Sequence, residues 1–192
     1  MLEFAILGLL HESPMHGYEL RKRLNATLGT FRAISYGSLY PTLRKMREAG
    51  WIGQQTPAPE SGAPALTSRR GKVVYQLTAE GKERFADLLA EAGPDAFEDA
   101  GFGVHFAFFA RTDADVRLRI LEGRRRKVEE KREGLRTTLG RTRVRLDSYT
   151  EELQRHGLES VDREVRWLNE LIAHERAGDP PAVTPEQTRH DR

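Results

Sequence analysis

The chain of 192 residues contains no cysteine. This absence excludes a disulfide framework, a thiolate metal site and a cysteine nucleophile, and it makes a reducing cytoplasm the expected compartment. Long apolar runs are also missing, because none approaches the roughly 20 residues that a membrane span needs. The apolar opening of the chain carries Glu3 and has no basic region before it, so we interpret it as a core helix and not as a signal peptide.

The residue patterns of catalytic and metal sites are absent as well. The six histidines are scattered along the chain, without the HExxH spacing of a metalloprotease. No Walker loop occurs, and the GFG at 101–103 lacks the further glycine of a dinucleotide-binding fingerprint. The sequence therefore predicts a protein that is not an enzyme and that holds no cofactor and no metal.

The charge of the chain is unevenly distributed, although its formal net value is only +2. Between Pro14 and Leu77 there are ten lysines and arginines against three glutamates, an excess of seven positive charges. A basic block of this kind is typical of a surface that binds phosphate groups. A solvated face without a partner is the alternative that charge alone leaves open.

Hydrophobic spacing predicts three helices at the start of the chain, over 2–12, 18–29 and 35–50. The second has an apolar stripe of Leu20, Leu24 and Leu28, and the third has one of Leu39, Leu43 and Met46. Two β-rich runs at 51–56 and 72–78 predict a hairpin, and Thr78 is the expected N-cap of a fourth helix over 79–93. Gly93-Pro94 is the expected domain boundary.

The second half of the chain predicts long helices. Five phenylalanines between 97 and 109 indicate a buried hub, and heptad spacing indicates a coiled-coil helix from about 114 to 156. Gly157 is the expected end of that helix, and Ser160 is the expected cap of a last helix that folds back on it. The predicted domains are 1–93, 94–177 and a disordered tail over 178–192.

Three helices, a hairpin and a fourth helix, in that order, predict a winged helix-turn-helix domain, whose third helix enters the DNA major groove. The predicted fold is mainly α, with this domain and its small β-hairpin wing followed by an antiparallel coiled coil of long helices. Hydroxyl, tyrosine and cationic side chains on the outer face of the third helix suit base edges and phosphates. The predicted DNA contacts are Tyr36, Ser38, Tyr40, Pro41, Thr42, Arg44 and Lys45 from the helix, and Arg69, Arg70 and Lys72 from the wing.

These residues also carry a family resemblance. The segments FAILGLL, HGYELRKRL, SYGSLYPTLRKMREAGWI and VYQLTAEGKE, within residues 2 to about 90, resemble the N-terminal domain of the PadR-like transcriptional regulators. The second half, from FGVHFAFF through RWLNELI, is similar to the helical C-terminal region of the longer members, which is related to virulence activators. The chain departs from the family pattern in its long wing loop and in Val74, which stands at an aromatic position.

The resemblance implies a homodimer built through the C-terminal helices, with the first helix often contributing. It also implies binding to a pseudo-palindromic double-stranded DNA operator, repression of a neighbouring gene, and release of that repression by a small molecule. A winged helix that binds only protein, with the coiled coil as a scaffold, is the alternative, and the basic third helix favours DNA. For a planar aromatic effector the sequence offers a candidate pocket, with plain core packing as the alternative interpretation: Phe102, Phe106, Phe109 and Trp167.

Overall fold

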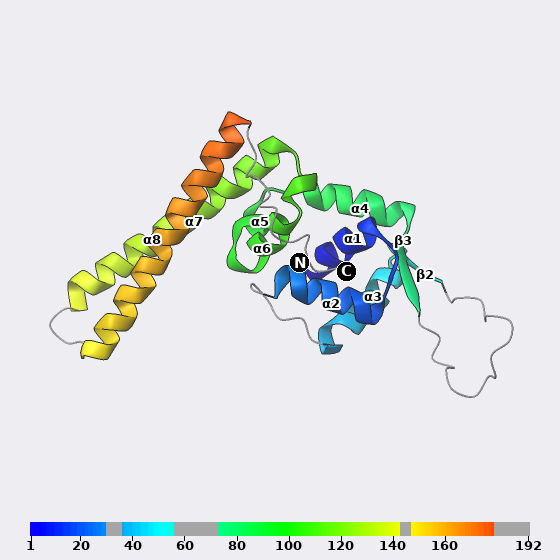
Figure 1. Ribbon diagram of the computed structural model, residues 1–192, viewed down its shortest axis with the longest axis horizontal. Coiled ribbons are helices and arrows are strands. Elements are labelled where there is room, and N and C mark those ends of the chain that lie inside the picture. The colour runs from blue at the N-terminus through cyan, green and yellow to red at the C-terminus, as the bar shows by residue number, and fades with distance from the viewer. Residues whose placement is uncertain (30–35, 56–72, 143–146, 179–192) are drawn as a thin grey trace, which may run out of the picture. The chain divides into compact units, whose positions relative to one another are not determined.

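The computed structural model describes residues 1–29, 36–55, 73–142 and 147–178, and of residues 36, 141 and 142 it describes the backbone only. By its contacts the chain divides into two units, Met1–Glu91 with Asp99–Asp113, and Ala92–Glu98 with Ala114–Arg192. The elements, labelled in Figure 1, are α1 (Leu2–Glu12), β1 (Met15–His16), α2 (Gly17–Leu28), α3 (Tyr36–Glu48), β2 (Ile52–Gln55), β3 (Val74–Leu77), α4 (Ala79–Ala90), α5 (Pro94–Phe97), α6 (Asp99–Ala107), the 3-10 helix η1 (Phe109–Arg111), α7 (Ala114–Thr142) and α8 (Ser148–Ala177).

Helix α1 is the centre of the first unit. Every residue from Phe4 to Leu10 is buried, because α1 packs against α2, α3, α4 and strand β3. A helix that is enclosed on most sides must be apolar around most of its circumference, which explains the unbroken apolar run at the start of the chain. The two leucine-rich stripes predicted for α2 and α3 are confirmed as the buried faces of those helices.

A small antiparallel sheet lies beside these helices, with the strand order β1-β3-β2. The predicted hairpin is confirmed as β2 and β3, with Gln54 opposite Tyr75. The strand β1 was not predicted, because two residues after Pro14 are too few to show a β pattern. It pairs Met15 with Tyr75, so the central strand is hydrogen-bonded on both sides.

A tight junction fixes the end of α3 against the start of α4. Gly50, at φ 76°, turns the chain out of α3, and its carbonyl oxygen accepts a hydrogen bond from the hydroxyl of Thr78 at 2.7 Å. The same hydroxyl oxygen accepts the Gly81 N–H at 3.0 Å, so Thr78 is the N-cap of α4, as predicted. A Cβ at Gly81 would lie 2.0 Å from the Trp51 carbonyl oxygen, so this position requires glycine.

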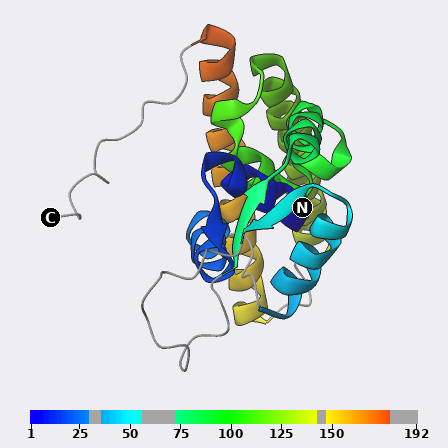
Figure 2. The same ribbon diagram turned by 90° about the vertical axis from the view of Figure 1, so that its right-hand side faces the viewer.

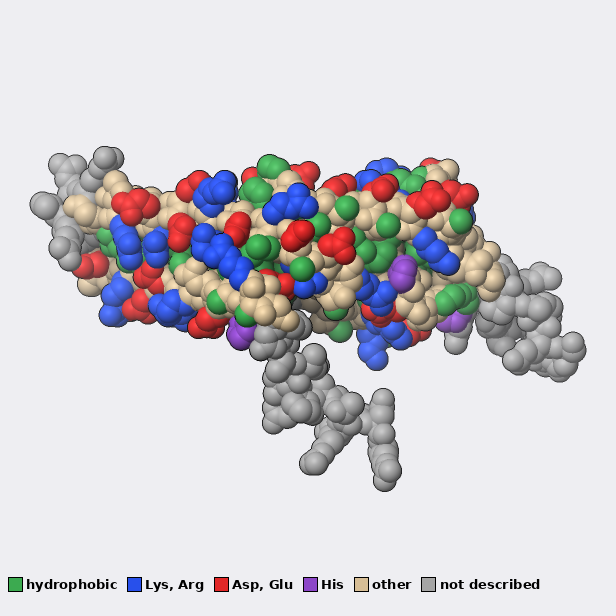
Figure 3. Space-filling view, turned by 90° about the horizontal axis from the view of Figure 1, so that it is seen from above, with side chains coloured by type: hydrophobic (Ala, Val, Ile, Leu, Met, Phe, Trp, Pro, Cys, Tyr) green, Lys and Arg blue, Asp and Glu red, His purple; other side chains and the backbone are tan. Residues whose placement is uncertain are grey.

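The second unit is a helical hairpin in which α8 folds back antiparallel on α7, as predicted, and the two helices lie side by side in Figures 1 and 2. Arg117 donates two hydrogen bonds across the hairpin to Glu175, at 2.9 and 2.7 Å, and Arg124 donates one to Glu164 at 2.8 Å. Basic and acidic side chains are interspersed over the face of the molecule that Figure 3 shows. The buried apolar residues of α7 and α8 are Val116, Ile120, Leu121, Val128, Val161, Val165, Leu168, Leu171 and Ile172.

The predicted single helix from 114 to 156 is wrong. Helix α7 ends at Thr142 and α8 begins at Ser148. Gly157 and Ser160, the expected end of one helix and cap of the next, both lie inside α8. A Cβ at Gly157 would meet nothing within 4 Å, so that glycine marks no turn and no close approach.

The cap that starts α8 is Asp147. Its carboxylate accepts the Thr150 hydroxyl at 2.7 Å and the N–H groups of Thr150 and Tyr149 at 3.1 and 3.0 Å. These bonds, with the Thr150 hydroxyl the strongest, hold the pKa of the Asp147 carboxyl below its ordinary value. The capping contribution to stability is therefore present above the unfolded-state pKa and is lost as the pH falls through the folded-state pKa.

The division of the chain differs from the predicted boundary in two elements, α6 and η1. Helix α5, which begins at Pro94, belongs to the second unit, whereas α6 and η1 belong to the first. The physical reason is aromatic packing, since the rings of His105 and Phe108 pack against that of Phe4 of α1, with centroids 4.7 and 5.3 Å away. The predicted disordered tail, beyond Gly178, lies outside the described residues. Within the described ranges, no helix is both long enough and apolar enough to cross a membrane.

Candidate nucleic-acid interface

Helix α3 presents a polar outer face opposite its buried stripe. Ser38, Pro41 and Arg44 are exposed on it, while Thr42 is half-buried and its hydroxyl donates to the Ser38 carbonyl at 2.8 Å. The helix continues through Pro41, which lacks the N–H that would otherwise bond to the Gly37 carbonyl. Ser38, Pro41 and Arg44 thus lie on the accessible side of the helix, which is the geometry that a recognition helix needs.

The three cations of α3 have different surroundings. Arg44 is exposed and has no hydrogen-bond or ion-pair partner among the residues that the structure describes. The Lys45 ammonium group lies 2.8 Å from a carboxylate oxygen of Glu3, so it is directed toward α1. Arg47, which was not among the predicted contacts, donates through Nη1 to the Oε1 atom of Gln54 on β2 at 3.1 Å.

The start of α2 adjoins α3 on the side of Tyr40. Tyr40 is 46% exposed, and a Cβ at Gly17 would lie 3.3 Å from its hydroxyl oxygen. The neighbouring Tyr18 is 68% exposed and was not predicted as a site residue. An aromatic side chain in the first turn of a helix is an ambiguous pattern in sequence, because core packing explains it equally well.

The wing is described only at its base. Strand β2 ends at Gln55, and strand β3 begins at Val74. The predicted wing cations Arg69, Arg70 and Lys72 lie outside the described residues. Their contact with DNA stays a prediction. The side chain of Tyr36 is likewise outside the description.

The predicted effector residues lie in two different units. In the first unit, the ring centroids of Phe102 and Phe106 are 5.7 Å apart and those of Phe106 and Phe109 are 5.0 Å apart. Phe102 is buried, whereas Phe106 and Phe109 are half-buried. Trp167 lies on α8 in the second unit and is 37% exposed. That these four residues line one pocket therefore remains a prediction.

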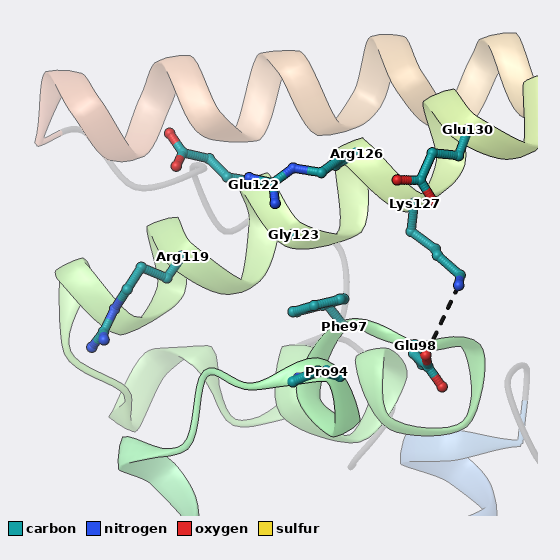
Figure 4. Close-up of a pocket in the computed structure, with 9 residues that line it drawn as sticks. All are labelled: Pro94, Phe97, Glu98, Arg119, Glu122, Gly123, Arg126, Lys127 and Glu130. Atoms are coloured by element: carbon teal, nitrogen blue, oxygen red, sulfur yellow. Dashed lines mark ion pairs between the residues drawn. The ribbon is translucent and has the colours of Figure 1, made fainter. Parts of the chain in front are cut away.

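The second unit contains a pocket of about 420 Å³ beside α5. Figure 4 shows the ring of Phe97 beneath Gly123 of α7, where a Cβ would lie 2.5 Å from that ring. Among the lining carboxylates, Glu98 pairs with Lys127 at 3.9 Å and Glu122 pairs with Arg176 at 2.6 Å. The complete lining is Pro94, Phe97, Glu98, Arg119, Glu122, Gly123, Arg126, Lys127 and Glu130.

Three helices, a β-hairpin and a further helix, with α3 exposed beside strand β2, define a winged helix-turn-helix protein with a C-terminal helical hairpin. Residues 6–87 match the transcriptional regulator PadR-like family.

Curated relatives include the negative transcriptional regulator PadR of Bacillus subtilis (strain 168), which is 30% identical over 94 residues, 49% of this chain and 48% of that protein. The probable transcriptional regulator Rv1176c of Mycobacterium tuberculosis (strain ATCC 25618 / H37Rv) is 32% identical over 90 residues, 47% of this chain and 44% of that protein. The chain thus spans about half the length of the curated relatives that it matches.

The solved structures that are similar to the chain include two of known biological role. The Bacillus subtilis PadR structure in complex with operator DNA is 22% identical, covers 91% of this chain and 98% of that chain, and has a TM-score of 0.42. The structure of the Vibrio cholerae virulence activator AphA is 18% identical, covers 93% of this chain and 99% of that chain, and has a TM-score of 0.37.

Proposed function

We propose that the protein is a cytoplasmic, homodimeric regulator that binds a pseudo-palindromic DNA operator and represses a neighbouring gene. The observation that carries this proposal is the outer face of α3, where Ser38, Pro41 and Arg44 are exposed beside strand β2 in a PadR-like domain. Repression is the mode named for the Bacillus subtilis relative, a negative transcriptional regulator.

The chemistry of this face suits the DNA major groove. The hydroxyl of Ser38 can bond to base edges or to phosphates, and the exposed guanidinium of Arg44 can bridge the O6 and N7 atoms of guanine. The surrounding segment carries an excess of seven positive charges, which supplies the attraction to phosphate that most DNA-binding affinity requires.

A titration of the full-length protein against the DNA upstream of its own coding sequence tests this proposal. We expect tight binding that weakens steeply with salt, and a loss of at least roughly tenfold in Arg44→Ala, because a bidentate contact with guanine contributes about 1–3 kcal/mol of discrimination. Arg166→Ala is the matched control, since Arg166 is an exposed arginine on α8 in the other unit. Equal binding to the upstream DNA and to unrelated DNA, unchanged in Arg44→Ala, would instead support a protein-binding winged helix.

The proposal includes release of the operator by a small aromatic ligand. Two places support such a ligand, the cluster of Phe102, Phe106 and Phe109 and the pocket beside Phe97. A panel of phenolic acids and cationic aromatic compounds, followed by tryptophan fluorescence and by loss of DNA binding, tests for release. Loss of the response in Phe106→Ala but not in Arg126→Ala would assign the ligand to the cluster, and the reverse would assign it to the pocket. No response to any compound would count against an aromatic effector.

A further inference from the structure

The last turn of α3 is linked to the base of the wing by one side-chain hydrogen bond. Arg47 and Gln54 are both exposed, and the bond from Nη1 to Oε1 is 3.1 Å long. Gln54 lies on β2, an edge strand of the sheet, one residue before the strand ends and the wing loop begins. The guanidinium of Arg47 is therefore held at strand β2.

This bond leaves Arg47 able to bind an anion. Gln54 is neutral, so it orients the guanidinium without cancelling its charge, and the remaining N–H donors are free of the glutamine. Arg44 lies three residues earlier, so the two arginines are neighbours along the same face of the helix. Together they form a cationic strip that ends at the strand.

Lys45 differs from Arg47 in the charge of its partner. Its ammonium group is 2.8 Å from the carboxylate of Glu3, and this ion pair joins α3 to the first turn of α1. An acidic partner offsets the positive charge that a phosphate would otherwise meet. Lys45 is thus engaged within the protein, although its sequence position next to Arg44 makes it look equivalent.

We propose that Arg47, oriented by Gln54, contacts a DNA phosphate beside the wing, whereas Lys45 acts as a positioning residue that holds α3 to α1. This proposal rests on the proposed function. A phosphate is the expected partner because the N-terminal part of a recognition helix meets base edges, whereas Arg47 lies in the last turn of α3. Arg44, nearer the middle of the helix, is left as the base-reading arginine.

Fluorescence anisotropy with the full-length protein tests the assignment. The probes are a duplex that the wild type selects from a randomised library, and an unrelated duplex of the same length. In Arg47→Met the affinity for both duplexes should fall roughly fivefold near physiological salt, and the slope of log K against log salt should shrink by about 0.9, which corresponds to one phosphate contact. Lys45→Met should leave that slope unchanged.

Two further variants separate charge from orientation. Arg47→Lys keeps the positive charge and should keep the salt slope. Gln54→Met should weaken DNA binding in the wild-type background. It should have no added effect in Arg47→Met, because Gln54 acts on binding only by orienting Arg47. Thermal unfolding of each variant checks that the fold is intact, and Arg47→Lys keeps the test valid if Arg47→Met is destabilised.

Three results would overturn the assignment. A slope that shrinks in Lys45→Met but not in Arg47→Met would exchange the two roles. A loss in Arg47→Met confined to the selected duplex would make Arg47 a base-reading residue. If the wild type binds neither duplex, the proposed function itself fails, and this assignment fails with it.

Discussion

At the scale of single residues, the junction after α3 requires that residue 81 have no Cβ atom, as only glycine does. A Cβ there would lie 2.0 Å from the Trp51 carbonyl oxygen and 3.1 Å from Cδ1 of Leu77. The carbonyl cannot easily move, because it accepts the Thr78 N–H at 3.2 Å. The identity of this residue is therefore set by backbone packing.

We predict that Gly81→Ala lowers the free energy of unfolding by about 3 kcal/mol, since overpacking against backbone has no cheap relaxation. Thermal unfolding followed by circular dichroism measures the change. Gly134→Ala on α7 is the matched control, because a Cβ there would meet nothing within 4 Å. That control should raise stability by about 0.5–1 kcal/mol, as alanine favours a helix interior. Equal effects of the two substitutions would contradict the packing argument.

At the scale of elements, the α7–α8 hairpin combines an apolar seam with partly buried ion pairs. The side chains of Arg117 and Glu175 are 20% and 8% exposed, and two hydrogen bonds join them. By contrast, the side chains of Arg155 and Glu152 are 63% and 62% exposed. The two pairs look alike as contacts but differ in how much solvent screens them.

We predict that Arg117→Met lowers the free energy of unfolding by about 3 kcal/mol, because it leaves the Glu175 carboxylate buried without its cation. The double variant Arg117→Met, Glu175→Met should recover most of that loss. Arg155→Met should change stability by less than about 1 kcal/mol. Urea unfolding curves of the three variants and of the wild type measure these changes. A double variant less stable than Arg117→Met would refute the explanation.

The elements also show which parts of the fold the sequence predicts. Helices α1 to α4 follow from apolar spacing with a cap or a glycine at the end, as Thr78 and Gly50 illustrate. The break between α7 and α8 could not be found in this way, because the heptad pattern continues through it to Tyr149, which is 87% exposed on α8. Asp147 is the residue whose capping pattern could have indicated the break.

The outer face of α3 was predictable for a similar reason, since it is the complement of a buried stripe. What each cation on that face contacts was not predictable. Glu3 is 42 residues from Lys45 in sequence, and the bond from Arg47 to Gln54 crosses a helix end, a turn and a strand start. Helical periodicity determines the direction of a side chain but not its partner in another element.

At the scale of the whole molecule, the proposed function requires two recognition helices about 34–36 Å apart, so that they meet successive major grooves. The two-fold symmetry of a dimer would fix this spacing between its two recognition helices. The start of α8 offers apolar side chains that a second copy would cover, because Leu153 is 70% exposed there and Tyr149 even more so. Exposed large apolar side chains near one another are typical of interaction surfaces.

We predict that the double variant Tyr149→Glu, Leu153→Glu is monomeric, because charged groups cannot be buried in an interface without partners. Sedimentation equilibrium should show two chains per particle for the wild type and one for the variant. Affinity for a duplex with two half-sites should fall by roughly 100-fold or more, because the second half-site is no longer bound intramolecularly. Binding to a single half-site should be unchanged, since α3 lies in the other unit. Ser160→Glu, at an exposed position on α8, is the control and should remain dimeric. A wild-type protein that sediments as a monomer while binding both half-sites tightly would refute the dimer.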